Sequence, residues 1–145
     1  MPPVSRQIAN EEDFIARYLA PLAADCPGAF GLADDAALIA VPAGEDLVVT
    51  TDAVAAGVHF FADDAPGDIA WKALAVNLSD LAGKGATPLA YQMALSLPDL
   101  PEPAWMEGFV AGLREAQRAF GIRLSGGDTD RRPGPLTITL TAMGT

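Results

Sequence analysis

The chain has 145 residues, half of them hydrophobic, with 19 acidic and 9 basic residues and a formal net charge of -10. This length suits one domain with its own core, and the acidic balance argues against nucleic-acid backbones and anionic membranes as partners. The single cysteine, Cys26, excludes an internal disulfide and favours a reducing compartment. The first residues carry no hydrophobic signal segment and no apolar run reaches the roughly 20 residues that span a bilayer, so we expect a cytoplasmic protein.

The first half of the chain predicts a helix followed by strands. Residues 10–20 have a helical apolar stripe, Asn10 can cap that helix, and Pro21 should end or kink it. Residues 34–41 and 46–54 have the composition of two strands, and the sequence PAGE between them suggests a hairpin.

The second half continues the mixture of helix and strand. A helix is expected from near Asp68 to Gly85, and a longer one over residues 102–121. Strands are expected over residues 122–125 and 135–144, and over residues 87–98, where one face carries Leu89, Tyr91, Met93, Leu95 and Leu97. The sequence therefore predicts one mixed α and β domain over residues 1–145. Because it stops at Thr145 directly out of a strand, we expect a domain taken from a longer protein.

The aspartates lie mostly at the ends of predicted elements. Asp34 and Asp35 enter one predicted strand, Asp52 leaves another, and Asp128 lies in SGGDTD. Asp80 is predicted to share a helical face with Asn77 and Lys84, while Leu74, Leu78 and Leu81 face the core. Carboxylate and amide oxygens together with threonine hydroxyls are ligands that Mg²⁺ accepts, beside water and phosphate oxygens. These residues could therefore form a magnesium site.

The sequence SGGDTD supplies the complementary feature. Its two glycines allow backbone N–H groups to approach an anion closely, and Asp128 can hold a metal on that anion. The sequence is not a P-loop, because no G-x-x-x-x-G-K-[ST] occurs. With so much negative charge nearby, phosphate groups need divalent cations to neutralise them.

Each of these patterns also has a simpler interpretation. Asp34-Asp35 can be a turn, Asp52 a loop cap, Asp80 the polar side of an amphipathic helix, GGDTD a hairpin turn and His59 a packed or surface histidine. Only their joint occurrence, in this order, favours a site.

Together, the sequences ADDAALI, TTDAVAAGVHF, KALAVNLSDLAGKGATP and SGGDTD resemble the amino-terminal domain of the thiamine-monophosphate kinase family. That family belongs to the superfamily of aminoimidazole ribonucleotide synthetase and selenophosphate synthetase. The resemblance implies an α+β fold with a mixed, largely antiparallel sheet flanked by helices. It also implies ATP-dependent phosphoryl transfer to thiamine monophosphate, assisted by several Mg²⁺ ions and without an acid or base residue.

The resemblance implies the following site residues. Metal ligands would be Asp35, Thr50, Thr51, Asp52, Asp80 and Asp128; Gly127 and Asp128 would contact ATP, and His59 would contact the substrate. It further implies a second domain beyond Thr145 and a homodimer in which amino-terminal sheets pack together. The strands with Leu89–Leu97 and Leu136–Leu140 are candidates for that packing. Two other hypotheses stay open: another ATP-using member of the superfamily, and a non-catalytic module that binds nucleotide or metal and dimerises.

Overall fold

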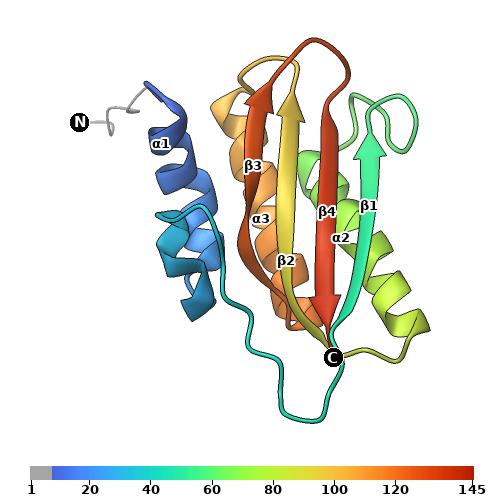
Figure 1. Ribbon diagram of the computed structural model, residues 1–145. Coiled ribbons are helices and arrows are strands. Elements are labelled where there is room, and N and C mark those ends of the chain that lie inside the picture. The colour runs from blue at the N-terminus through green and yellow to red at the C-terminus, as the bar shows by residue number, and fades with distance from the viewer. Residues whose placement is uncertain (1–7) are drawn as a thin grey trace.

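The computed structural model describes residues 8–145 (Figure 1). Residues 1–7, where the sequence predicts no targeting segment, lie outside the described residues. The elements in chain order are α1 (Glu11–Phe14), the π-helical turn η1 (Ile15–Leu19), the 3-10 turns η2 (Ala20–Ala23) and η3 (Pro27–Leu32), β1 (Val48–Ala55), α2 (Pro66–Gly83), β2 (Pro88–Leu97), α3 (Pro103–Phe120), β3 (Arg123–Arg131) and β4 (Thr137–Gly144). Within residues 8–145, no helix is both long and apolar enough to cross a membrane.

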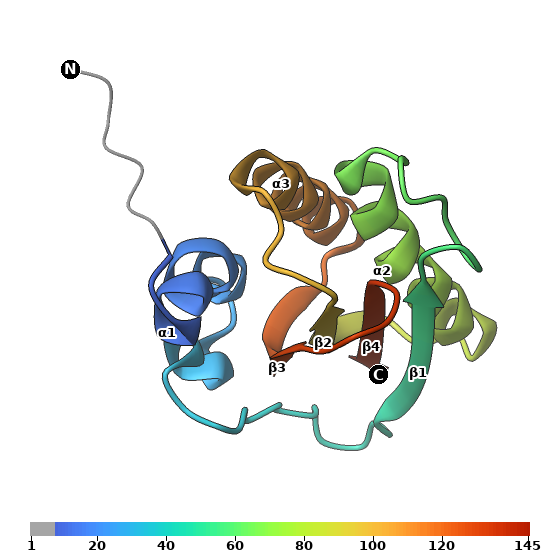
Figure 2. The same cartoon turned by 90° about the horizontal axis from the view of Figure 1, so that it is seen from above.

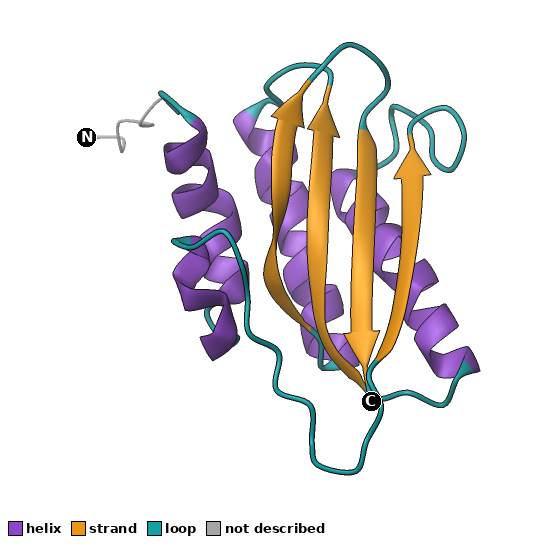
Figure 3. Ribbon diagram, in the orientation of Figure 1, coloured by secondary structure: helices purple, strands orange, loops and turns teal. Residues whose placement is uncertain are grey.

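The strands form one sheet in the order β1-β4-β2-β3. Strand β4 is antiparallel to both of its neighbours, whereas β2 and β3 run parallel. A parallel pair needs a crossover connection, and α3 provides it between β2 and β3. The predicted mixed, largely antiparallel sheet with flanking helices is confirmed (Figure 3).

Helices α2 and α3 cover one face of the sheet, and the other face carries no helix (Figure 2). The core lies between the sheet and these helices. It contains side chains that are almost completely buried: Leu74 and Leu81 of α2, Phe109 and Leu113 of α3, Leu95 of β2, and Ile138 and Leu140 of β4. The apolar side chains of the strands proposed for dimer packing, such as Leu95 and Leu140, therefore face the chain's own helices. Burying them attaches the helices to the sheet, so only the opposite face of these strands is open for packing, and the dimer stays a prediction.

The predicted hairpin between residues 34–41 and 46–54 is also wrong. Residues 34–41 form no strand, and β1 pairs with β4 instead. Leu38 donates its N–H to the carbonyl of Gly28 at 2.9 Å, so this segment is fixed to η3 and not to a sheet. The side chain of Leu38 is 72% exposed, so the apolar residues of segment 34–41 bury too little surface to form a core strand.

The predicted first helix is short and irregular. Asn10 caps it as expected, because its Oδ1 accepts the N–H of Asp13 at 2.9 Å. The α-helical turn then passes into η1 and, around Pro21, into η2. A proline has no N–H to give to an α-helical ladder, and this accounts for the predicted interruption.

Candidate active site

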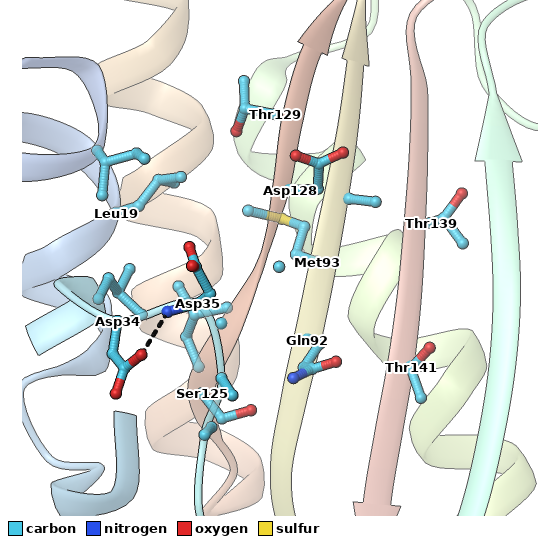
Figure 4. Close-up of a pocket in the computed structure, with 18 of the residues that line it drawn as sticks. Leu19, Asp34, Asp35, Gln92, Met93, Ser125, Asp128, Thr129, Thr139 and Thr141 are labelled. Atoms are coloured by element: carbon cyan, nitrogen blue, oxygen red, sulfur yellow. Dashed lines mark hydrogen bonds between the residues drawn. The ribbon is translucent and has the colours of Figure 1, made fainter. Parts of the chain in front are cut away.

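A pocket of about 470 Å³ lies between the sheet and the segment that follows η3. Its floor is formed by Gln92 of β2 and by Thr139 and Thr141 of β4 (Figure 4). These residues alternate along their strands with buried Met93, Leu140 and Ala142, so they lie on the sheet face that no helix covers. The pocket is thus built on the face of the sheet opposite to the core.

Two of the predicted metal ligands, Asp35 and Asp128, line this pocket. Asp35 comes from the segment after η3 and Asp128 from β3, 93 residues later by their sequence numbers. Asp34 accepts the N–H of Asp35 on its Oδ1 at 2.7 Å, as drawn in Figure 4, and this fixes the local turn. The turn interpretation of Asp34 and the pocket position of Asp35 are therefore compatible.

The glycines of SGGDTD lie inside β3, so the hairpin-turn interpretation is wrong. Gly127 pairs with Met93 of the parallel strand β2 and has φ = +148°. A Cβ there would lie 1.8 Å from the carbonyl oxygen of Met93, whereas a Cβ on Gly126 would have its nearest neighbour, Gln92 Nε2, at 3.7 Å. The sheet itself requires the second glycine, and the glycine pair places Asp128 at the pocket wall.

A second group of predicted ligands lies at β1 and α2. The hydroxyl of Thr50 donates to Oδ2 of Asp80 at 3.2 Å. Thr50 and Asp52 are paired with the buried residues Ala142 and Leu140, so they share the sheet face that α2 covers. The Asp52 carboxylate accepts the N–H of Ala53 at 2.9 Å. Asp80 and Asp52 are both exposed, at the edge of the sheet.

Thr51 points to the opposite face from Thr50, because neighbouring residues of a strand alternate. Its hydroxyl shares a hydrogen bond of 2.9 Å with the hydroxyl of Thr141, which lines the pocket. The run TTD is therefore divided by the sheet: Thr51 belongs to the pocket side, and Thr50 and Asp52 belong to the α2 side. The sequence predicts that Asp52 leaves the strand, but β1 continues to Ala55.

Asn77 does not share the exposed face of Asp80. Its side chain is completely buried, and its Nδ2 donates to the carbonyl of Ala73 at 3.0 Å. The predicted cage of Asn77 and Asp80 is therefore wrong, because Asn77 points into the core with Leu74, Leu78 and Leu81.

His59 lies in the turn after β1 and does not line the pocket. Its Nδ1 accepts the N–H of Ala55 at 3.0 Å, and the Lys72 ammonium donates to its carbonyl oxygen. The side chain is exposed. Of the two simpler interpretations, a packed or a surface histidine, the exposed side chain agrees with the second, and a role of His59 toward a substrate stays a prediction.

Within residues 8–145, no group of three or more His, Cys, Asp or Glu side chains is placed to hold a metal ion. The pocket nevertheless fits Mg²⁺ in the chemistry of its donors. Asp35 and Asp128 are hard oxygen ligands, and Mg²⁺ commonly takes one or two carboxylates and completes its shell with water and substrate phosphates. The structure does not bring Asp52 and Asp80 together with this pair, because both lie on the α2 side of the sheet and outside the pocket.

Several pocket residues were missed by the sequence analysis. The apolar wall of Ile15, Leu19 and Leu32 follows from tertiary packing and has no local signal. Thr139 and Thr141, in contrast, could have been found, because they alternate with the core residues of a strand whose other face was expected to be buried.

Residues 33–145 match the family model described as AIR synthase related protein, N-terminal domain. Curated relatives include the thiamine-monophosphate kinase of Caulobacter vibrioides, 46% identical over 93% of this chain and 38% of the relative. The kinase of Escherichia coli K12 is 47% identical over 79% of this chain and 34% of the relative. The chain thus spans little more than a third of the length of these relatives.

Solved structures give the same relationship. The thiamine-monophosphate kinase of Stenotrophomonas maltophilia is 49% identical with a TM-score of 0.71, over 78% of this chain and 35% of that one. A complex described as AaThiL with AMPPCP and TMP is 28% identical with a TM-score of 0.67, over 81% and 41% of the two chains. A hydrogenase maturation protein HypE in complex with ATP is 25% identical with a TM-score of 0.76, over 92% and 39%.

Proposed function

Because the chain belongs to the AIR synthase related protein family, whose N-terminal domain it contains, we propose that it is the nucleotide-binding part of a thiamine-monophosphate kinase. The reaction is transfer of a phosphoryl group from ATP to thiamine monophosphate. The kinases 46–49% identical to this chain support the assignment, as does the related complex that contains AMPPCP and TMP. The structural observation that carries it is one pocket with Asp35 and Asp128 on its walls.

We assign the phosphate groups of ATP to this pocket, at Gly127 and Asp128. Asp35 and Asp128 would hold Mg²⁺, and Thr51 would support the pocket floor through its hydrogen bond to Thr141. When bound, Mg²⁺ supplies positive charge that neutralises phosphate oxygens, which a chain of net charge -10 otherwise repels. Thr50, Asp52 and Asp80 are proposed to hold further ions at the β1 edge, where the hydroxyl of Thr50 contacts the carboxylate of Asp80 and Asp52 lies on the same strand face as Thr50.

No general base is needed from the chain. The acceptor is a phosphate monoester, whose second pKa is about 6, so at neutral pH its attacking oxygen already carries no proton. The task of the protein is then to hold two anionic groups in line and to exclude competing water. His59 is proposed to contact the acceptor, in keeping with its exposed position.

We also propose that two chains pack through the sheet face that carries no helix. Exposed apolar side chains on the segment leading into β1 and on β1 itself support this, namely Leu38, Leu47 and Val49. Sedimentation velocity tests it: a monomer at all concentrations up to the millimolar range would contradict the dimer.

A cytoplasmic location, without membrane or nucleic-acid partners, is part of the proposed function.

A kinase assay tests the function. The protein expressed from its whole reading frame should form thiamine diphosphate from ATP and thiamine monophosphate, and Asp128→Asn should lower kcat by at least about 100-fold. We expect little turnover from residues 1–145 alone, because a second domain is proposed to complete the site. Efficient turnover by the 145-residue chain would contradict that part of the proposal.

Two alternatives predict other results. Product formed only with a different acceptor would indicate another ATP-using member of the superfamily, a reading that the similarity to HypE in complex with ATP favours. Stabilisation by Mg-ATP without any turnover in the whole protein would indicate a binding module.

A further inference from the structure

Building on the proposed function, we propose that Lys72 is a positioning residue for His59. It fixes the turn of residues 55–60 so that His59 meets the substrate as a neutral imidazole whose Nε2–H donates a hydrogen bond. Lys72 itself lies on α2, outside the phosphate pocket.

The turn of residues 55–60 has a defined backbone. The carbonyl of Ala55 accepts the N–H of His59 at 2.9 Å and that of Val58 at 3.2 Å. The N–H of Gly57 donates to the carbonyl of Phe60 at 2.8 Å, and Gly57 has φ = +79°, which a glycine adopts at little cost. Phe60 is buried and attaches the turn to the core. His59 is therefore exposed on a backbone that is held at several points.

The hydrogen bonds of His59 select its tautomer. The N–H of Ala55 donates to Nδ1 at 3.0 Å, so Nδ1 must carry a lone pair. A neutral imidazole with an accepting Nδ1 has its proton on Nε2. A proton added to Nδ1 would remove this bond, and so would a metal ion. The turn thus selects the Nε2–H tautomer of the neutral ring.

Lys72 connects the turn to the rigid part of the molecule. Its ammonium donates to the carbonyl oxygen of His59, and it lies on the helix whose Ile69, Ala70 and Leu74 are at most 2% exposed. This bond restrains the peptide that follows the His59 side chain. Without it, the imidazole could rotate away from Ala55 and exchange tautomers.

A neutral Nε2–H suits an anionic acceptor. It binds a phosphate oxygen through one directed hydrogen bond and cannot transfer a full proton to it. The acceptor oxygen thus keeps the negative charge that makes it a nucleophile, in keeping with a reaction that needs no base.

The chain offers a clean spectroscopic test, because His59 is its only histidine and Lys84 is its only other lysine. We expect ¹⁵N NMR of the 145-residue chain to show the Nε2–H tautomer. Lys72→Met should mix the tautomers and speed amide exchange of Ala55 about tenfold. Lys72→Arg should restore both signals, and Lys84→Met, which removes the same charge from the residue that follows α2, should change neither. A predominant Nδ1–H tautomer, or identical spectra for Lys72→Met and Lys84→Met, would overturn the proposal.

Kinetics of the protein expressed from its whole reading frame provide the second test. Lys72→Met should raise KM for thiamine monophosphate about tenfold and leave KM for ATP unchanged, with rescue by Lys72→Arg. If the tautomer is lost while KM stays the same, His59 does not bind the acceptor and the role of Lys72 toward substrate is rejected. Because the spectra need no ligand, absence of kinase activity would reject the proposed function and leave the tautomer result standing.

Discussion

Gly126 and Gly127 are neighbours in β3 but experience different constraints. Gly127 lies against the backbone of β2 with φ = +148°, whereas a Cβ on Gly126 would make only an ordinary van der Waals contact with Gln92 Nε2 at 3.7 Å. The pair can therefore separate a structural need for glycine from a functional one. Gly126 lines the pocket, so a side chain there reaches the ligand space without disturbing the sheet.

We expect Gly127→Ala to destabilise the fold by at least about 2 kcal/mol, because it adds a backbone clash to an unfavourable φ. Gly126→Ala should change the free energy of unfolding by less than about 0.5 kcal/mol. Urea denaturation of the two variants measures both values. Equal stability of the two would show that the close approach of β2 and β3 at Met93 is not rigid.

Tyr91 provides a test through pH. Its ring is completely buried, and its hydroxyl has no hydrogen-bond partner among the described residues. Burial raises the pKa of the Tyr91 phenol well above its ordinary value of 10, because the phenolate loses its hydration. The unfolded chain therefore releases this proton at lower pH than the folded one. The contribution of the protonated Tyr91 phenol to the free energy of unfolding is therefore complete below pH 10 and is lost as the pH rises above 10.

Tyr91→Phe should accordingly be neutral or stabilising by up to about 1 kcal/mol at pH 7, since the hydroxyl makes no bond. Above pH 10, the free energy of unfolding of the variant should rise relative to that of the wild type by up to about 1.4 kcal/mol per pH unit. Urea titrations at pH 7, 10 and 11 measure the difference. A constant difference across these values would mean that Tyr91 ionises equally easily in both states.

Some residue positions follow from spacing and others do not. The helical period places Leu74, Leu78 and Leu81 inward correctly, as the structure confirms. The same period places Asn77 three residues after Leu74 and four before Leu81, on the apolar side of α2, where it is completely buried. The prediction of a polar face for Asn77 gave its amide more weight than its spacing, and the bond from Nδ2 to the carbonyl of Ala73 shows how the helix accommodates that amide.

Helices α2 and α3 approach each other closely where each carries a glycine. A Cβ on Gly112 would lie 2.4 Å from the carbonyl oxygen of Gly67. Gly83, at the end of α2, has no atom within 4 Å of such a position. Small residues allow two helix backbones to meet at this distance, so the crossing of α2 and α3 depends on the first pair and not on Gly83.

We expect Gly112→Ala to cost about 1–3 kcal/mol by forcing the helices apart. Gly83→Ala should instead be neutral or stabilise by up to about 1 kcal/mol, because alanine favours the helix. Thermal unfolding separates the two, with a shift of several degrees for the first variant. A wild-type melting temperature for Gly112→Ala would contradict the tight crossing.

The elements that the sequence predicts best are those with a long, strict period. Residues 102–121 and 135–144 place their apolar side chains at helical and alternating intervals, and both elements form as expected. Residues 34–41 are apolar without a period, and composition alone gave a strand. Such a segment becomes a strand only where a neighbouring strand is free to pair with it. Strand β1 pairs instead with β4, whose residues come 82 or more positions later in the sequence.

Residues from the two halves of the chain meet at the pocket. Asp35 comes before the first strand in the sequence and Asp128 lies on β3. The pocket therefore forms only when the segment after η3 lies over β3. The sequence predicted the donors but not this placement, because no local pattern specifies which face of the sheet the segment crosses. On a chain of net charge -10, the two carboxylates make the pocket unfavourable for a bare polyphosphate.

Mg²⁺ and ATP should consequently stabilise the protein only together. With Mg-ATP at ten times its Kd, we expect about 1.4 kcal/mol of added stability, or roughly 2–4 °C in Tm, for the protein expressed from its whole reading frame. Asp35→Asn and Asp128→Asn should each abolish most of that shift. Asp99→Asn, an exposed acid outside the pocket, should keep it while changing the net charge equally. The control removes the same charge as the two pocket variants. If only the pocket variants lose the Tm shift, Asp35 and Asp128 are direct ligands; if all three variants lose it equally, the effect is only that of long-range charge. An unchanged shift with ATP and a chelator would exclude the metal from binding.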